Sequence, residues 1–218
     1  MNEPPRRVLR PRDAASLLLV RSVRDGAFEV LMGRRHHGHV FMPGAWVFPG
    51  GRVEPADAAV EPAAPLRPDV AARLVRTASA RRARALAVAA VRETFEETGL
   101  LLAPDPVPEA WNRALHPRLD ALDYVYRAVT PPGAPRRFNT RFFMADATHA
   151  HGVIRGDGEL EEIAFVPLEE ARKLAALAVT SRVLAEVARL VAEPPPPDPL
   201  RPMPVSRWLH GKRRVDIE

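Results

Sequence analysis

The chain has 218 residues, of which 46% are hydrophobic, and this favours one globular domain with extensions over two small domains. It contains no cysteine, which excludes disulfides and thiolate metal sites and is typical of proteins in a reducing cytoplasm. The net charge of +5 comes almost entirely from arginine. It either serves solubility or attracts an anionic ligand such as a phosphate ester.

Two classes of partner are not expected. No segment reaches the roughly 20 apolar residues that span a bilayer, so the sequence predicts no membrane partner. The calculated pI of about 10.5 is compatible with a basic nucleic-acid binder. However, the sequence holds no helix-turn-helix, zinc-finger or RNP-type motif, so no nucleic-acid partner is expected. The expected location is cytoplasmic.

The first elements in chain order are a flexible arm and a hairpin. Residues 1–11 are rich in proline and arginine and are expected to form the arm. The strand-like runs 13–22 and 28–35 flank Asp25 and Gly26, a pair typical of a hairpin turn. The next expected elements are a loop over 34–44, a short strand over 45–51 that ends in a Pro-Gly-Gly turn, and an irregular linker over 52–68.

Two helices are expected after this linker. Asp69 can cap a helix over 70–78, and Ser79 precedes a second helix that runs to Thr98 and stops at Gly99. The remaining expected elements are strands at 122–130, 139–147 and 160–168, helices at 168–177 and 182–192, the latter capped by Thr180 or Ser181, and a Pro-rich tail over 194–218. Strands with interspersed helices and no regular βαβ alternation predict an α/β fold in which helices sandwich a mixed β-sheet.

The stretch RETFEETGL carries an unusual cluster of carboxylates. Glu93, Glu96 and Glu97 share one face of the expected helix, because residues three and four apart are neighbours. Like charges at this spacing destabilise a helix by roughly 0.2–0.5 kcal/mol per pair. Helix stability therefore does not account for the cluster, which is either an ordinary solvated face or a site for something positive.

Together with FPGG at Phe48–Gly51, this stretch resembles the signature of the Nudix hydrolases. That signature is a glycine, five residues, a glutamate, seven residues and then Arg-Glu-U-x-Glu-Glu-x-Gly-U, where U is a bulky aliphatic residue. The second half matches except that Thr94 occupies a U position. Asp57 stands where the family has its first glutamate, and residues 58–84 then interrupt the signature.

The interruption resembles a subgroup of the family that has a long insertion at this place and includes a peroxisomal coenzyme A diphosphatase. The stretches 41–57 and 129–145 also resemble that subgroup, with Asn139 in place of the more usual aspartate. The resemblance implies a Nudix-type α/β/α sandwich with a mixed β-sheet over residues 12–193.

The same resemblance implies a metal-dependent hydrolase that cleaves a diphosphate linkage in a nucleoside diphosphate joined to a second moiety. Glu93, Glu96 and Glu97 would hold Mg²⁺ or Mn²⁺, hard cations that prefer oxygen ligands. The carbonyl of Gly50 would be a further ligand, and Arg92 would pair with a neighbouring carboxylate and orient it. The alternative is an acidic surface face without a metal.

Further candidate site residues lie outside the signature. An additional acid/base group or metal ligand would be Glu159 or Glu162, and a solvated strand edge is the alternative for each. Arg34, Arg35 and Arg141 are candidates for binding a substrate phosphate, because the guanidinium group matches phosphate geometry. Arginines on a solvated hairpin end are the alternative interpretation.

Coenzyme A or an acyl-CoA is the substrate that the subgroup implies. ADP-ribose, NADH or another nucleotide would fit the same family, and a non-catalytic Nudix-fold binding or regulatory module is the alternative from another class. The three intact glutamates disfavour that module. Trp208, in the tail, is expected to dock on the domain or on a second subunit, and a homodimer would be consistent with the latter.

Overall fold

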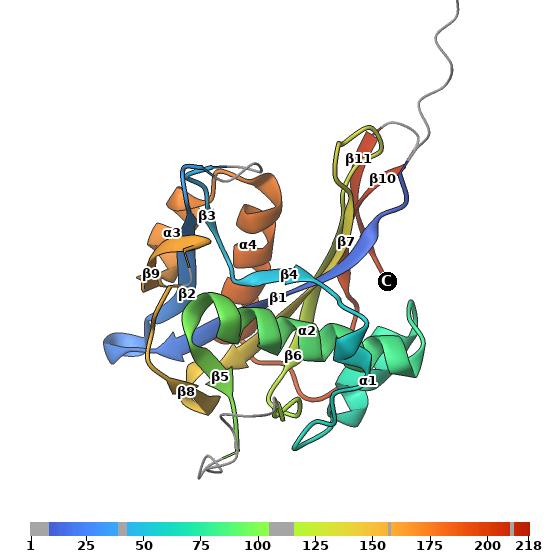
Figure 1. Cartoon of the computed structure of the whole chain (residues 1–218), viewed down its shortest axis with the longest axis horizontal. Helices are drawn as coiled ribbons and strands as arrows, with labels where there is room; N and C mark the ends of the chain where they lie inside the picture. The colour runs from blue at the N-terminus through green and yellow to red at the C-terminus, as the bar shows by residue number, and fades with distance from the viewer. Residues whose placement is uncertain (1–8, 39–42, 105–115, 157, 210–211) are drawn as a thin grey trace, which may run out of the picture.

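The computed structural model describes residues 9–38, 43–104, 116–156, 158–209 and 212–218 (Figure 1). The strands are β1 (Arg12–Ser22), β2 (Phe28–Arg35), β3 (Trp46–Val47), β4 (Gly50–Arg52), β5 (Leu100–Leu102), β6 (Asp123–Val129), β7 (Phe138–Asp146), β8 (Ala150–Gly152), β9 (Leu160–Pro167), β10 (Pro204–Leu209) and β11 (Lys212–Ile217). The α-helices are α1 (Pro68–Val75), α2 (Ala80–Thr98), α3 (Leu168–Leu174) and α4 (Ala178–Ala192). Among the described residues, no helix is long and apolar enough to cross a membrane.

The large sheet is mixed and has β1 at its centre. Strand β1 runs parallel to β7 and antiparallel to β2 and β4, and β9 extends the sheet beyond β2. On the other side, β6 pairs with β7 and β10 pairs in parallel with β6. The expected hairpin joins β1 to β2, and Asp25 and Gly26 take the positive φ angles of 63° and 71° that such a tight turn favours.

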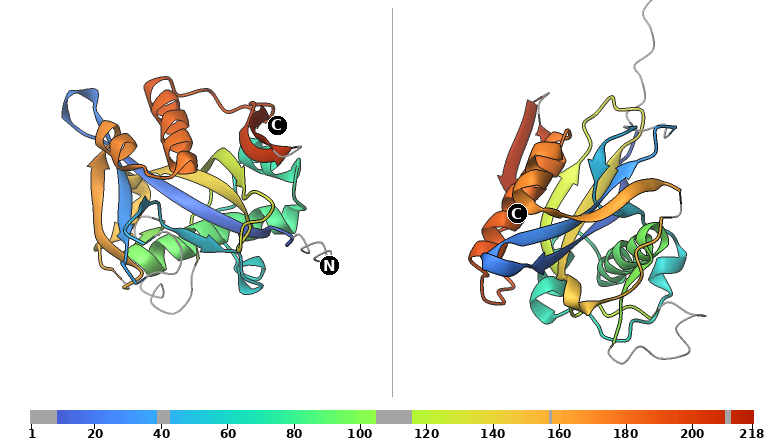
Figure 2. Two further views of the ribbon diagram at one scale, coloured as in Figure 1. Left: turned by 90° about the horizontal axis from the view of Figure 1, so that it is seen from above. Right: turned by 90° about the vertical axis from the view of Figure 1, so that its left-hand side faces the viewer.

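Helices cover both faces of this sheet. One core cluster packs apolar residues of α1 and α2 against one face, and a second packs α3 and α4 against the opposite face. Figure 2 shows α2 and α4 on the two sides of β1. The expected α/β/α sandwich with a mixed sheet is confirmed.

The insertion 58–84 folds outside the sheet. It contains a loop, helix α1 and the start of α2, and α1 packs against α2 and β6. Asp69 does not cap α1 as expected, because the helix starts one residue earlier, at Pro68. Its carboxylate instead pairs with Arg67 at 3.2 Å and with Arg73 at 3.2 Å.

The C-terminal segment takes more structure than the expected Pro-rich tail. Residues Pro204–Leu209 form β10 beside β6, and β11 pairs antiparallel with β10. Trp208 therefore sits on a strand of the domain's own sheet, which agrees with its expected docking on the domain. Of the expected N-terminal arm, residues 1–8 lie outside the described residues.

Helix α2 begins and ends as its sequence predicts. The Ser79 side chain accepts a hydrogen bond from the Arg82 backbone N–H at 3.3 Å, and Gly99 ends the helix with φ 74°. Helix α4 instead starts at Ala178, ahead of the expected caps at Thr180 and Ser181, and its N-cap residue Leu177 makes no side-chain cap hydrogen bond.

Replacing Ser79 with alanine is expected to lower the free energy of unfolding by about 1 kcal/mol, because it removes the N-cap acceptor of α2. Urea denaturation followed by circular dichroism measures this change. Ser181→Ala is the control, since no hydrogen bond of its hydroxyl is seen within the described chain. Equal stability of the Ser79 variant and the wild type would show that the cap contributes nothing.

Candidate active site

The two halves of the interrupted signature meet at the C-terminal part of α2. The backbone N–H of Gly50 donates to Oε2 of Glu97 at 3.0 Å. A Cβ atom on Gly51 would lie 2.5 Å from the carboxylate of Glu93. The turn therefore lies beside both carboxylates, Gly50 beside Glu97 and Gly51 beside Glu93, and the insertion does not separate the two halves.

Glycine is required at this turn for two different reasons. Gly50 has φ 154°, and a Cβ on it would lie 2.5 Å from the carbonyl oxygen of Ala15. At Gly51 the conflict is with the Glu93 carboxylate itself. The bare backbone of β4 thus lets the helix carboxylates approach the sheet closely.

Arg92 is held by a carboxylate that comes from the start of the insertion. Its Nε and Nη2 donate to the two carboxylate oxygens of Asp57 at 2.8 and 3.2 Å, a bidentate pair. Its Nη1 donates to Glu93 at 3.0 Å and to Glu96 at 2.9 Å. Asp57 is 1% exposed and also accepts the backbone N–H of Glu54 at 2.7 Å, so it is fixed in place.

Burial and neighbouring charge act in opposite directions in this cluster. Burial raises the pKa of Glu93, and the adjacent Arg92 opposes that rise. For Arg92, burial alone would lower the pKa, but its hydrogen bonds to Asp57 and the charges of Glu93 and Glu96 raise it overall. The guanidinium therefore stays charged, while Glu93 is a carboxylate that gains from further positive charge.

These groups line one end of a cavity of about 640 Å³. Its lining residues come from elements that Figure 1 shows around β4 and α2, with β2 and β3 on the left and β7, β10 and β11 at the upper right. Glu54, Glu93, Glu96 and Glu97 line the cavity from the loop after β4 and from α2. Helix α4 starts at the cavity, so the positive end of its dipole adjoins this space.

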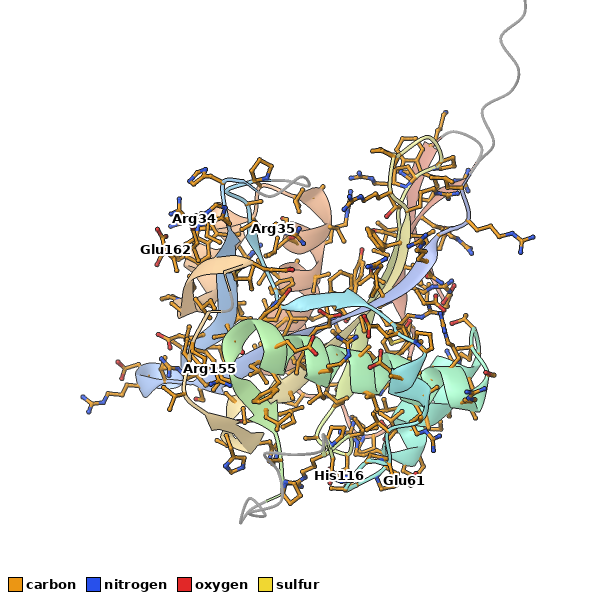
Figure 3. The ribbon with its side chains drawn as sticks, viewed as in Figure 1. Arg34, Arg35, Glu61, His116, Arg155 and Glu162 are labelled. Atoms are coloured by element: carbon orange, nitrogen blue, oxygen red, sulfur yellow. The ribbon has the colours of Figure 1, made fainter. Side chains whose placement is uncertain are left out.

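The two neighbouring arginines at the end of β2 have different surroundings. Arg35 lines the cavity together with Glu159, whereas Arg34 forms ion pairs with Glu162 and, at 3.8 Å, with Glu161. Figure 3 shows Arg34 and Glu162 beside each other at the outer edge and Arg35 further in. Of the two candidates for an additional acid/base group or metal ligand, Glu159 lines the cavity and Glu162 does not.

Arg35 is partly buried, and its pKa is lowered overall. Burial lowers the pKa of its guanidinium, and the charges of Glu97 and Glu159 oppose that effect. The three residues therefore lie close enough for their charges to interact across the cavity.

Arg141 is not brought to the cavity. Its side chain is 1% exposed, and its Nη1 donates to Asp13 at 2.8 Å and to the carbonyl of Asn139 at 3.2 Å. Asn139 also donates to Asp13, at 3.0 Å. Arg141 and Asn139 thus connect β7 to the start of β1 through Asp13. Arg141 therefore has a structural role here and not the expected role of binding a phosphate.

Comparisons with known proteins agree with this geometry. No family model and no curated protein matches the sequence. A NUDIX hydrolase from Alicyclobacillus acidocaldarius matches the structure with a TM-score of 0.63 and 27% identity, covering 84% of this chain and 96% of that one. The Nudix hydrolase RenU from M. smegmatis matches with a TM-score of 0.50 and 17% identity, covering 85% and 88%.

The sequence signature, its reassembly around Gly50 and Gly51, and the shared fold agree. Together they support placing the chain in the Nudix hydrolase superfamily. The match to the NUDIX hydrolase from Alicyclobacillus acidocaldarius supports a hydrolase of that superfamily.

The two residue replacements within the Nudix signature have local explanations. Thr94 occupies an aliphatic position, where it is 1% exposed and its hydroxyl donates to the Ala90 carbonyl at 2.8 Å, so no polar group is left unpaired. Asp57 replaces the first glutamate and still reaches Arg92. Asp57 was not predicted as a site residue, although its position in the signature was the available signal.

The donor chemistry of this Nudix site suits a hard divalent cation. Carboxylate oxygens of α2 face a glycine turn in which a Cβ would fill the space beside Glu93. No three His, Cys, Asp or Glu side chains converge as a ready ligand set in the described part of the chain. Glu93 and Glu96 both accept hydrogen bonds from Arg92.

Proposed function

We propose that this chain is a Nudix diphosphatase that cleaves a nucleoside diphosphate joined to a second moiety, using Mg²⁺ or Mn²⁺. Glu93, Glu96 and Glu97 would hold the cation, with the Gly50 carbonyl as a further ligand. The observation that carries the proposal is the contact of the Gly50–Gly51 turn with Glu93 and Glu97 at one end of the cavity. A bound divalent cation supplies charge stabilisation on the phosphoryl oxygens and lowers the pKa of water.

Three further residues would orient the glutamates, bind a substrate phosphate and accept a proton. Arg92, fixed by Asp57, holds Glu93 and Glu96 in place and limits their mutual repulsion. Arg35 would bind a phosphate oxygen of the substrate from the opposite wall. Glu159 would take the proton of the attacking water, as its carboxylate lines the same cavity. A bond then forms between water oxygen and phosphorus, and the anhydride P–O bond breaks.

Coenzyme A is the proposed substrate within this class, supported by the sequence resemblance to the long-insertion subgroup. A panel of coenzyme A, ADP-ribose and NADH with Mg²⁺ or Mn²⁺, with products identified by mass spectrometry, tests it. Coenzyme A should yield 3′,5′-ADP and 4′-phosphopantetheine. A much higher kcat/KM for ADP-ribose or NADH would reject coenzyme A and keep the diphosphatase. Lack of turnover on every member would favour a binding module.

Asp57→Asn is expected to lower kcat by about 10- to 100-fold with little change in KM, because Arg92 loses its anionic partner and the glutamates lose their orientation. Steady-state kinetics with coenzyme A measures this. Asp57→Glu, the residue usual in the family, should recover most of the loss. An unchanged kcat in folded Asp57→Asn would remove Asp57 from the site.

Three expectations about the surroundings of the enzyme stay predictions. They are the homodimer, the absence of a nucleic-acid partner and the cytoplasmic location. Analytical ultracentrifugation and a salt-dependent gel-shift assay with generic DNA and RNA test the first two.

A further inference from the structure

The cavity has a second wall that the sequence did not reveal. Trp208 of β10, Arg213 of β11 and Arg182 of α4 line the same cavity as the signature glutamates. Two of these residues lie on the C-terminal hairpin, outside the range that resembles the long-insertion subgroup.

The three side chains converge from neighbouring elements. Trp208 and Arg213 are directly opposed in the β10–β11 register, and cross-strand partners project from the same face of a sheet. Arg182 also borders a small hollow with Pro204 and Val215 of the hairpin. Because Val215 and Arg213 are two apart on β11, they share a face, and that face adjoins α4.

The polar groups of this wall lack partners within the described chain. No hydrogen bond or ion pair joins Arg182 or Arg213 to any described residue, whereas their neighbour Arg207 pairs with Asp216 at 2.6 Å. The indole Nε1 of Trp208 is shielded from solvent and has no acceptor among the described residues. Two cations and an aromatic donor thus line the same cavity as the glutamates.

We propose that Trp208, Arg182 and Arg213 form a second subsite, which binds a nucleoside carrying a phosphate monoester at one end of the substrate. The proposal rests on the proposed function, in which the diphosphate lies at the glutamates. A remote phosphate needs cations supplied by the protein, and paired guanidinium groups match it. An indole suits a nucleobase because every base offers a face for stacking.

The test is calorimetric binding of adenosine 3′,5′-bisphosphate and of AMP to the full chain in EDTA, which requires neither metal nor turnover. The bisphosphate should bind about tenfold more tightly than AMP, a difference of about 1.4 kcal/mol. Arg182→Ala and Arg213→Ala should each remove most of this preference. Trp208→Ala should weaken both ligands, and Trp208→Phe should restore them. Arg214→Ala, on the same strand but not lining the cavity, is the matched control.

The outcomes separate this subsite from the proposed function. Retention of the binding preference in a chain that hydrolyses no diphosphate would support the subsite and reject the function. Equal binding of the two ligands, no binding of either, or an equal effect of Arg213→Ala and Arg214→Ala would overturn the subsite, even where hydrolysis is normal.

Discussion

Replacement of Glu97 by glutamine is expected to lower kcat by about a thousandfold, which corresponds to about 4 kcal/mol in activation free energy. Glu97 faces the Gly50 N–H at 3.0 Å and lines the cavity, so it lies where a cation and the diphosphate would meet. Glutamine keeps the shape of the side chain and removes its charge, so a cation would lose a charged ligand. Steady-state kinetics on the best diphosphate of the panel measures the loss.

Glu61→Gln is the matched control for this experiment. The Glu61 carboxylate is 81% exposed, interacts only weakly with Arg84 and does not line the cavity. Its replacement should leave kcat unchanged. Normal turnover by a folded Glu97→Gln variant would remove Glu97 from the catalytic machinery.

Arg73→Met is expected to cost about 3 kcal/mol of unfolding free energy, because it removes the fully buried cation that Asp69 and Asp123 share and leaves each carboxylate with fewer charged partners. The Arg73 side chain is 0% exposed and donates to Asp69 at 3.2 Å, to Asp123 at 2.6 Å and to the Tyr124 carbonyl at 2.6 Å. Arg201, from the C-terminal segment, donates to Asp123 and to the same carbonyl. This network joins the insertion helix α1 to β6 and to the segment that leads into β10.

Arg81→Met is the control, because Arg81 is exposed at the start of α2 and makes no hydrogen bond within the described chain. It should change the stability by less than about 0.5 kcal/mol. Guanidinium denaturation of both variants, followed by tryptophan fluorescence, gives the two values. A similar, small loss in both would show that the Arg73 network does not hold the insertion.

The sequence predicted those elements of the fold that are marked by nearby residues, such as apolar runs and helix-capping residues. Alternating and apolar runs gave β1, β2, β6, β7 and β9, and Ser79 and Gly99 marked both ends of α2. Strands β10 and β11 were not predicted. Their stretch is short, charged and preceded by a proline run, and β10 is fixed by its pairing with β6, a partner distant in sequence.

The candidate site was likewise predicted only where the signal was local in the sequence. The spacing of Glu93, Glu96 and Glu97 fixes their common helix face, and the Gly50–Gly51 turn reaches them as expected. The sequence did not indicate which of the candidate arginines line the cavity and which form ion pairs elsewhere. Arg141 is engaged by Asp13 and Arg34 by Glu162, and both partners are remote in the chain.

The most direct test of the account is the metal dependence of diphosphate hydrolysis. After treatment with EDTA and its removal, kcat would be measured as a function of added Mg²⁺ or Mn²⁺, for the wild type and for Glu97→Gln. The account predicts negligible wild-type turnover without metal, saturable recovery on addition, and weak recovery in the variant at the same concentrations. Full turnover by the metal-free wild type, or identical metal titrations for the two proteins, would contradict it.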